Sequence, residues 1–188
     1  TNYINNLTRE IRLRLVSNKT TGDAKLDFES IQITHHTCAD SLGCVVVRPG
    51  DPIHIAYLLN MTSLESKNGA LVGIDLSAGK ILGHPVKFDG VERADCNPAL
   101  ATTDSAKMRK DASIVAVVGT TCSSEAMSVM PGLSASGFTM VSPSNTSPAL
   151  TEWGNPNNHP GYSRVSWNDA EQGKKAAQYA YNSLGARK

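Results

Sequence analysis

Two segments of this chain concentrate side-chain hydroxyl groups. The first is Gly-Thr-Thr-Cys-Ser-Ser at residues 119–124, and the second is Ser-Pro-Ser-Asn-Thr-Ser-Pro at residues 142–148. The first leads into a predicted helix, whose N-terminus presents unpaired backbone N–H groups and the positive end of the helix dipole. Hydroxyls beside such groups can complete a site for a carboxylate or phosphate. The same residue types also cap helices and form turns, so either segment alone is more simply explained as local structure.

Short apolar runs alternate with helical patterns over the rest of the chain. The expected strands cover residues 53–59, 85–91, 114–118, 138–141 and 162–166, and the expected helices cover residues 64–78, 98–111, 124–136 and 170–184. This alternation predicts an α/β fold with a doubly wound, mostly parallel sheet. Ligands bind such sheets beyond the carboxyl ends of the strands. Both hydroxyl-rich segments follow strands there, which makes a binding site as reasonable an interpretation as turn chemistry.

Residues 1–51 differ from this pattern. They are rich in Asn and Thr and contain two short alternating runs, at residues 11–15 and 28–33, that suggest strands. We interpret them as an N-terminal extension of weak β-character. The expected organisation is therefore an extension at 1–51, a ligand-binding lobe at 52–167 and a crossing helix at 168–188.

The composition excludes some classes of function. The formal net charge is +1, which gives no electrostatic basis for nucleic-acid binding. No apolar run reaches membrane-spanning length. The chain opens on polar residues, so no signal peptide is expected within it.

Four cysteines without a CxxC pair favour disulfides and an oxidising compartment. The spacing of Cys38 and Cys44 permits a small disulfide loop. A zinc site that adds His35 and His36 is the alternative, although adjacent side chains on a strand point in opposite directions. We predict no metal site and no cofactor.

Enzyme signatures are weak. Gly-x-Ser-x-Gly is absent, and the phosphate-loop-like stretch at residues 73–80 has one residue too many between its glycines. A nucleophilic Cys122 would need a histidine partner, and nothing in the sequence places His84 or His159 beside it. The prediction is a protein that is not an enzyme.

Several blocks resemble a known family in their order and separation. They are IHIAYLLN, GKILGHPVKF, ADCNPALA, IVAVVGTTCSSEAMSVMPGLSASG, MVSPSNTSPALT and YSRVSWNDAEQGKKAAQYAYNSLGARK. Together these blocks resemble the N-terminal portion of type I periplasmic solute-binding proteins of the branched-chain amino-acid ABC importer class (leucine/isoleucine/valine-binding-protein-like). The resemblance spans residues 53–188, about 70% of the chain (136 of 188 residues).

The resemblance implies two lobes with a ligand cleft between them, of which the second is largely absent from this chain. By position, the Ser123 hydroxyl would bond the carboxylate of the ligand, with Ser124 beside it, and Thr146 would offer both its N–H and its hydroxyl. Ser144 and Asn145 would line the same wall, partly through their backbone. It also implies a disulfide between the cysteines at positions 96 and 122, as in amino-acid-binding relatives.

The implied function is the substrate-binding component of an ABC importer. The ligand would be an amino acid, such as a branched-chain one, or a similar small carboxylate, and the protein partner a membrane ABC permease. The location would be extracytoplasmic, in the periplasm or as a cell-surface lipoprotein. The alternatives are a ligand-sensing domain of a receptor or regulator with the same fold, and a purely structural domain.

Overall fold

A six-stranded sheet forms the centre of the computed structural model, which describes residues 3–5, 42, 44–60, 64–93 and 95–187. The strand order is β4-β5-β3-β6-β7-β8. The parallel strands are β3 (Ile53–Asn60), β5 (His84–Arg93), β6 (Ile114–Gly119), β7 (Thr139–Ser142) and β8 (Tyr162–Arg164), and β4 (Lys80–Ile81) pairs antiparallel with β5 at the edge.

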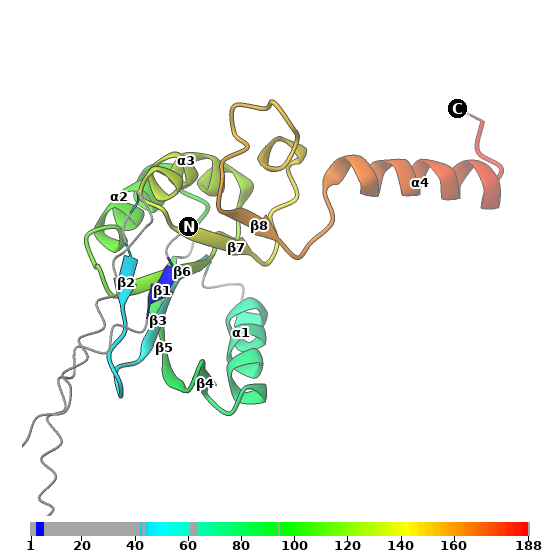
Figure 1. Ribbon diagram of the computed structural model, residues 1–188. Helices are drawn as coiled ribbons and strands as arrows, with labels where there is room; N and C mark the ends of the chain where they lie inside the picture. Colours follow the sequence, from blue (N-terminus) through cyan, green and yellow to red (C-terminus); the bar gives the residue numbers. More distant parts are fainter. Residues whose placement is uncertain (1–2, 6–41, 43, 61–63, 94, 188) are drawn as a thin grey trace, which may run out of the picture.

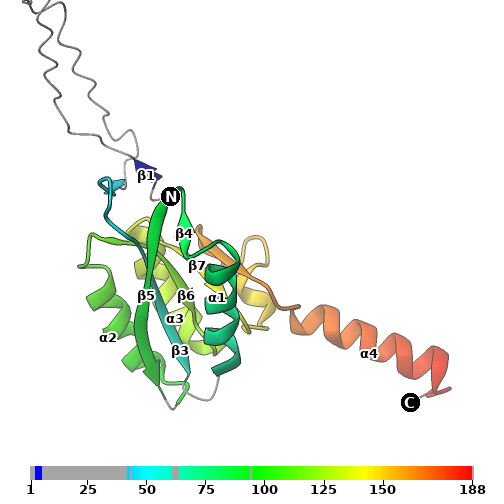
Figure 2. The ribbon, with the colours of Figure 1, turned by 90° about the horizontal axis from the view of Figure 1, so that it is seen from below.

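Helices lie on both faces of this sheet. Helices α2 (Pro98–Met108) and α3 (Ser123–Ala135) contact each other and cover one face, and α1 (Leu64–Leu76) lies on the other (Figures 1 and 2). The chain continues through a short 3₁₀ turn, η1 (Pro148–Leu150), and ends with α4 (Asp169–Ser183). The predicted doubly wound, mostly parallel sheet is confirmed.

The predicted elements form with boundaries shifted by a few residues. Helix α3 begins one residue earlier than expected, because Cys122 has extended backbone angles and acts as its N-cap. Asn97 caps α2, and its side-chain oxygen accepts hydrogen bonds from the N–H groups of Ala99 and Leu100. Strand β8 ends at Arg164, two residues short of the predicted end.

Alternation along β3 explains how both faces of the sheet are packed. Ala56 and Leu58 are buried in the core beneath α2 and α3. Ile53 belongs to a second buried cluster on the opposite face, together with Val115. A central parallel strand covered on both sides needs apolar residues at nearly every position, and IHIAYLLN supplies them.

The end of the predicted N-terminal extension contributes to the second cluster. Val45 and Val47 are buried against Ile53 and Val115. Strand β2 (Cys44–Val46) also pairs in parallel with β1 (Tyr3–Asn5) in a separate two-stranded sheet. The alternating runs predicted at residues 11–15 and 28–33 lie outside the described residues.

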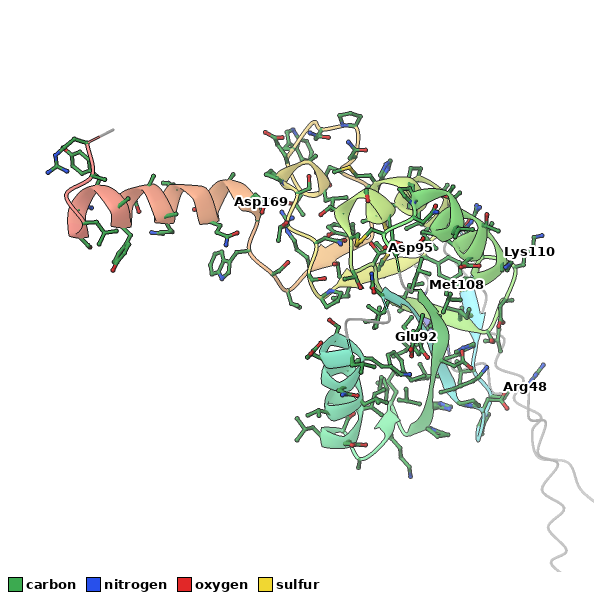
Figure 3. The ribbon with its side chains drawn as sticks, turned by 180° about the vertical axis from the view of Figure 1, so that it is seen from behind. Arg48, Glu92, Asp95, Met108, Lys110 and Asp169 are labelled. Carbon is green, nitrogen blue, oxygen red and sulfur yellow. A yellow bond between two sulfur atoms is a disulfide. The ribbon has the colours of Figure 1, made fainter. Side chains whose placement is uncertain are left out.

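Polar contacts attach α1 to the sheet. Lys67 forms an ion pair with Glu92, and the Tyr57 hydroxyl donates a hydrogen bond to the same carboxylate at 3.3 Å. The Lys67 ammonium lies 5.1 Å from the centre of the Tyr57 ring, within cation–π range. The hydrogen bond from Lys67 lowers the pKa of Glu92, which is labelled on β5 in Figure 3. These contacts hold α1, which has no buried residue of its own.

Helix α4 projects away from the sheet. It starts at Asp169, where the chain leaves the lobe, and it has no buried residue (Figures 1 and 3). None of the helices in the described part of the chain has the length and hydrophobicity needed to span a membrane.

Candidate functional site

The candidate site lies where strands β6 and β7 end. These neighbouring strands are parallel, with Val118 opposite Val141 in the register. Their carboxyl ends therefore open at the same edge of the sheet, and the two hydroxyl-rich loops start there. Strand β3, on the other side of β6, ends at the same edge. The strand order reverses at β3, which makes this edge the position where open α/β sheets bind ligands.

A glycine allows the first loop to leave the sheet close to β3. Gly119 has φ +147°, and a Cβ atom built on it would lie 2.4 Å from the Leu58 carbonyl oxygen. A larger residue would therefore displace the backbone. Beyond it, the buried Thr120 hydroxyl donates to the carbonyl of Cys122 at 2.8 Å, and the Thr121 hydroxyl accepts the N–H of Asn60 at 2.9 Å. The loop is thus fixed to both β3 and the start of α3.

The N-terminus of α3 presents backbone donors at this edge. Its N-cap, Cys122, makes no side-chain capping hydrogen bond, and the first N–H groups of a helix have no intrahelical acceptor. Ser123 and Ser124 occupy the first two helical positions, half-buried and exposed respectively. Glu125, the acidic residue of this turn, is buried. The exposed hydroxyl and the backbone N–H groups can bind an anionic group.

The structure brings the two predicted loops into direct contact. The Ser123 hydroxyl oxygen accepts the N–H groups of Thr146 and Ser147, each at 3.2 Å. In the reverse direction, the Ser144 hydroxyl donates to the Thr121 carbonyl at 2.9 Å. Residues more than twenty positions apart in sequence therefore form one polar wall.

Asn145 lies behind this wall and is fully buried. Its side-chain NH₂ donates to the Thr120 carbonyl at 2.9 Å, and its side-chain oxygen accepts the Tyr162 hydroxyl at 3.1 Å. Burial raises the pKa of Tyr162, which keeps this hydroxyl protonated and able to donate. The Asn145 side chain therefore joins the two loops and β8, and its backbone is buried as well, since its N–H donates to the Ser142 hydroxyl oxygen at 2.9 Å.

A disulfide braces the first loop. Cys96 and Cys122 are bonded, with their Cα atoms 5.7 Å apart, as the family resemblance implied. Cys122 caps α3, and Cys96 directly precedes the cap of α2, so the bond joins the N-termini of two helices. The other predicted pair involves Cys38, which lies outside the described residues, as do His35 and His36 of the alternative zinc site. The part of the chain that is described contains no cluster suited to a metal ion.

The segment after β8 is attached to the second loop along its length. The Arg164 guanidinium donates to the carbonyls of Asn145 and Ser147 at 3.3 and 2.7 Å. The Ser166 hydroxyl donates to the Asn145 carbonyl at 2.9 Å, and the Asp169 N–H donates to the Thr146 carbonyl at 2.8 Å. The start of α4 is therefore held beside the candidate site.

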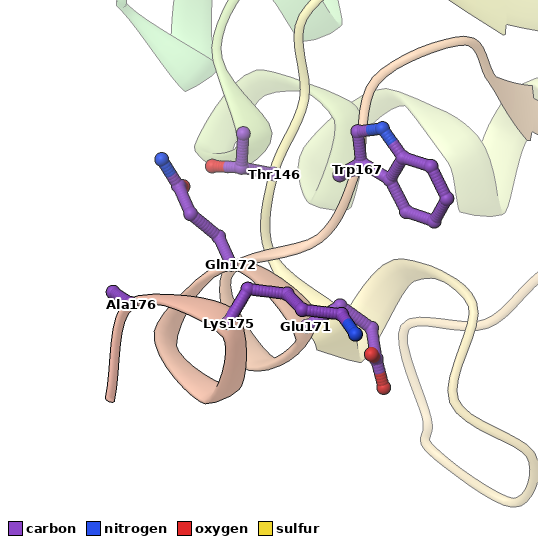
Figure 4. Close-up of a pocket in the computed structure, with 6 residues that line it drawn as sticks. All are labelled: Thr146, Trp167, Glu171, Gln172, Lys175 and Ala176. Atoms are coloured by element: carbon purple, nitrogen blue, oxygen red, sulfur yellow. The ribbon is translucent and has the colours of Figure 1, made fainter. Parts of the chain in front are cut away.

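A cavity of about 610 Å³ opens between this segment and the loop that carries Thr146. Figure 4 shows its lining, which consists of Thr146, Trp167, Glu171, Gln172, Lys175 and Ala176. Sequence reasoning identified Thr146 but missed Trp167 and the α4 residues. The sequence signal that could have drawn attention to Trp167 was its position directly before Asn168, the N-cap of α4.

The chain was compared with protein families, curated proteins and solved structures. No family model matches the chain, and no curated protein does. Solved structures do match. An ABC transporter substrate-binding protein from Sphaerobacter thermophilus aligns with 72% of this chain at 25% identity and a TM-score of 0.65, and a leucine-binding protein from Thermotoga maritima aligns with 71% at 23% identity and a TM-score of 0.62.

A solute-binding protein of an ABC transporter from Rhodopseudomonas palustris, in complex with p-hydroxybenzoic acid, matches 70% of the chain at 21% identity and a TM-score of 0.62. The chain spans only 36–38% of the length of these three structures. The fold is therefore that of one lobe of a type I periplasmic-binding protein. The particular similarity is to ABC substrate-binding proteins, among them leucine-binding and branched-chain amino-acid-binding ones.

Proposed function

We propose that this chain is the first lobe of an extracytoplasmic substrate-binding protein of an ABC importer, and that it binds the carboxylate of an amino acid or a similar small acid. The observation that carries the proposal is the contact of the two hydroxyl-rich loops through Ser123 and Thr146. This contact gathers hydroxyls and helix N–H groups at the strand edge where ligands bind in such sheets.

In this proposal the carboxylate docks on the N-terminus of α3. The hydroxyls of Ser123 and Ser124 and the first N–H groups of the helix approach it from one side, and the hydroxyl of Thr146 from the other. Ser144 and the backbone of Asn145 support the second loop. The disulfide at Cys122 holds the first loop in place before the ligand arrives, which reduces the entropy lost on binding.

Transport would follow from closure of a second lobe over the bound acid by hinge motion. A membrane ABC permease would then recognise the closed form. The Cys96–Cys122 disulfide supports an oxidising location outside the cytoplasm.

A thermal-shift screen against amino acids and small carboxylic acids tests the proposal. A ligand that binds only the folded protein stabilises it, by about 2.7 kcal/mol at a hundredfold excess over Kd. Hydrogen bonds to charged groups contribute roughly 1.5–3 kcal/mol each, so the double variant Ser123→Ala/Thr146→Ala should bind at least about tenfold more weakly.

The matched control is Thr103→Ala, since this exposed hydroxyl bonds only within its own helix. It should leave both stability and affinity unchanged. The absence of a melting shift with every acid, or equal affinity in the double variant and the control, would contradict the proposal.

A further inference from the structure

The cavity beside Thr146 is bordered by an unusually placed aromatic side chain. Trp167 is 81% exposed, although its indole lines the cavity (Figure 4). Leaving so large an apolar surface in water costs free energy that burial would recover. An exposed Trp beside a polar binding edge is a common feature of recognition surfaces.

The backbone of Trp167 is fixed relative to the candidate site. On its N-terminal side, the Val165 N–H donates to the Ser142 carbonyl at 3.1 Å, and the Ser166 hydroxyl donates to the carbonyl of Asn145. On its C-terminal side, the Asp169 N–H donates to the Thr146 carbonyl at 2.8 Å. The indole is therefore carried by a segment held on both sides of it to the loop of Thr146. Such preorganisation reduces the entropy lost on binding.

The lining of the cavity indicates the kind of group it can hold. The indole and the Ala176 methyl are apolar, and long side chains such as Gln172 and Lys175 add their methylene stems. Glu171 and Lys175 contribute one negative and one positive charge, so the lining has no net charge that would select a charged tail.

We infer that Trp167 is a specificity-determining residue, which packs against the uncharged apolar tail of a carboxylate held by the Ser123 and Thr146 loops. This inference rests on the function proposed above and narrows its ligand class. The favoured ligands are monocarboxylates with an aliphatic or aromatic tail. Acids whose tail is a single methyl group, or is charged, gain nothing from the indole.

The chain offers a matched control. Its only other tryptophan, Trp153, is 96% exposed and borders a different hollow of about 490 Å³, which is lined by loop residues and by neither hydroxyl-rich segment. Trp153→Ala therefore removes an exposed indole that does not line the cavity of the proposed tail.

The test measures the Kd of two pairs of acids, leucine with alanine and benzoate with acetate, by titration calorimetry. The Kd of the weaker acid of each pair is obtained from its displacement by the tighter one. Interface tryptophans commonly contribute 2 kcal/mol or more, so Trp167→Ala should weaken leucine or benzoate binding by about 10- to 100-fold. Alanine or acetate binding should change less than about threefold. Trp167→Phe should retain most of the preference, and Trp153→Ala all of it.

Fluorescence provides a second measurement. In Trp153→Phe the remaining tryptophan is Trp167, so its emission should shift to the blue when leucine or benzoate saturates the protein, and should not shift with alanine or acetate. Binding of these acids to the unmodified protein with no change of preference in Trp167→Ala would overturn this inference alone. Failure of all four acids to bind the unmodified protein would overturn this inference, and it would overturn the proposed function as well if no acid of the thermal-shift screen binds.

Discussion

Replacing Asn145 by Asp tests the central polar contact of the site with almost no change in shape. The amide lies in a fully buried position, where its NH₂ donates to the Thr120 carbonyl at 2.9 Å. An ionised carboxylate there would place an acceptor against an acceptor. The lost hydrogen bond costs about 1 kcal/mol, and placing a charge in a fully buried position adds more, so Asn145→Asp should lower the free energy of unfolding by roughly 2–4 kcal/mol near pH 7.

The effect should depend on pH in a defined direction. Desolvation raises the folded-state pKa of the introduced carboxyl above its unfolded value of about 3.9. Below the unfolded pKa the group is protonated in both states and can donate to Thr120, so the loss should shrink to about 1 kcal/mol. As pH rises from the unfolded to the folded pKa, the variant should lose about 1.4 kcal/mol per pH unit relative to the unmodified protein.

Asn168→Asp is the matched control for this experiment. The Asn168 side chain caps α4 by accepting the Glu171 N–H at 2.9 Å, and Asp serves equally well at a helix N-cap. Urea unfolding of both variants across the pH range would measure the difference. If Asn145→Asp were as stable as Asn168→Asp near neutral pH, the assignment of Asn145 as a buried donor would be refuted.

The remaining predictions concern the disulfide and a buried histidine. Joint replacement of Cys96 and Cys122 by Ser should destabilise the protein by about 3.5 kcal/mol on the loop-entropy model, given their separation of 26 residues. Denaturant unfolding with and without reductant measures this loss. If reductant did not cause the same loss of stability in the unmodified protein, the result would argue against the model. The His54 ring lies 2.7 Å from Asp89, and this hydrogen bond, with that of Lys87, lowers the pKa of Asp89. Because the folded-state pKa is depressed, the stabilisation by Asp89 is present above the unfolded pKa and lost as pH falls through the folded one. Asp89→Asn should therefore be less stable than the unmodified protein near pH 6, and the difference should vanish in acid. Since the Asp89 side chain is 54% exposed, we expect less than about 1 kcal/mol, and a difference independent of pH would contradict this account.

Local patterns made the fold readable from the sequence. The run IHIAYLLN is apolar at almost every position because β3 is covered on both faces. Gly119 ends the neighbouring strand β6, where the backbone passes too close to Leu58 for a side chain. These signals depend on residues near one another in the chain, so they survive without knowledge of the tertiary structure.

The sequence predicted only part of the candidate site, because the contacts between its loops join residues far apart in the chain. Hydroxyl-rich loops after two strands predicted a polar edge, and the resemblance added the Cys96–Cys122 pairing, which the structure confirms. The direct binding roles of Ser123, Ser124 and Thr146 stay predictions.

Only the tertiary structure separated Asn145 from its hydroxyl-bearing neighbours. Its polar side chain and its position in the loop are those expected of a ligand-binding residue. Its amide instead forms hydrogen bonds with Thr120 and Tyr162, which are 25 and 17 positions away in the sequence. Trp167 likewise lines the same cavity as Thr146, because the segment after β8 runs back along the β7 loop. Sequence determined which segments become strands, helices and polar loops; the order and register of the strands determined which side chains meet, because that depends on pairing between segments far apart in the chain.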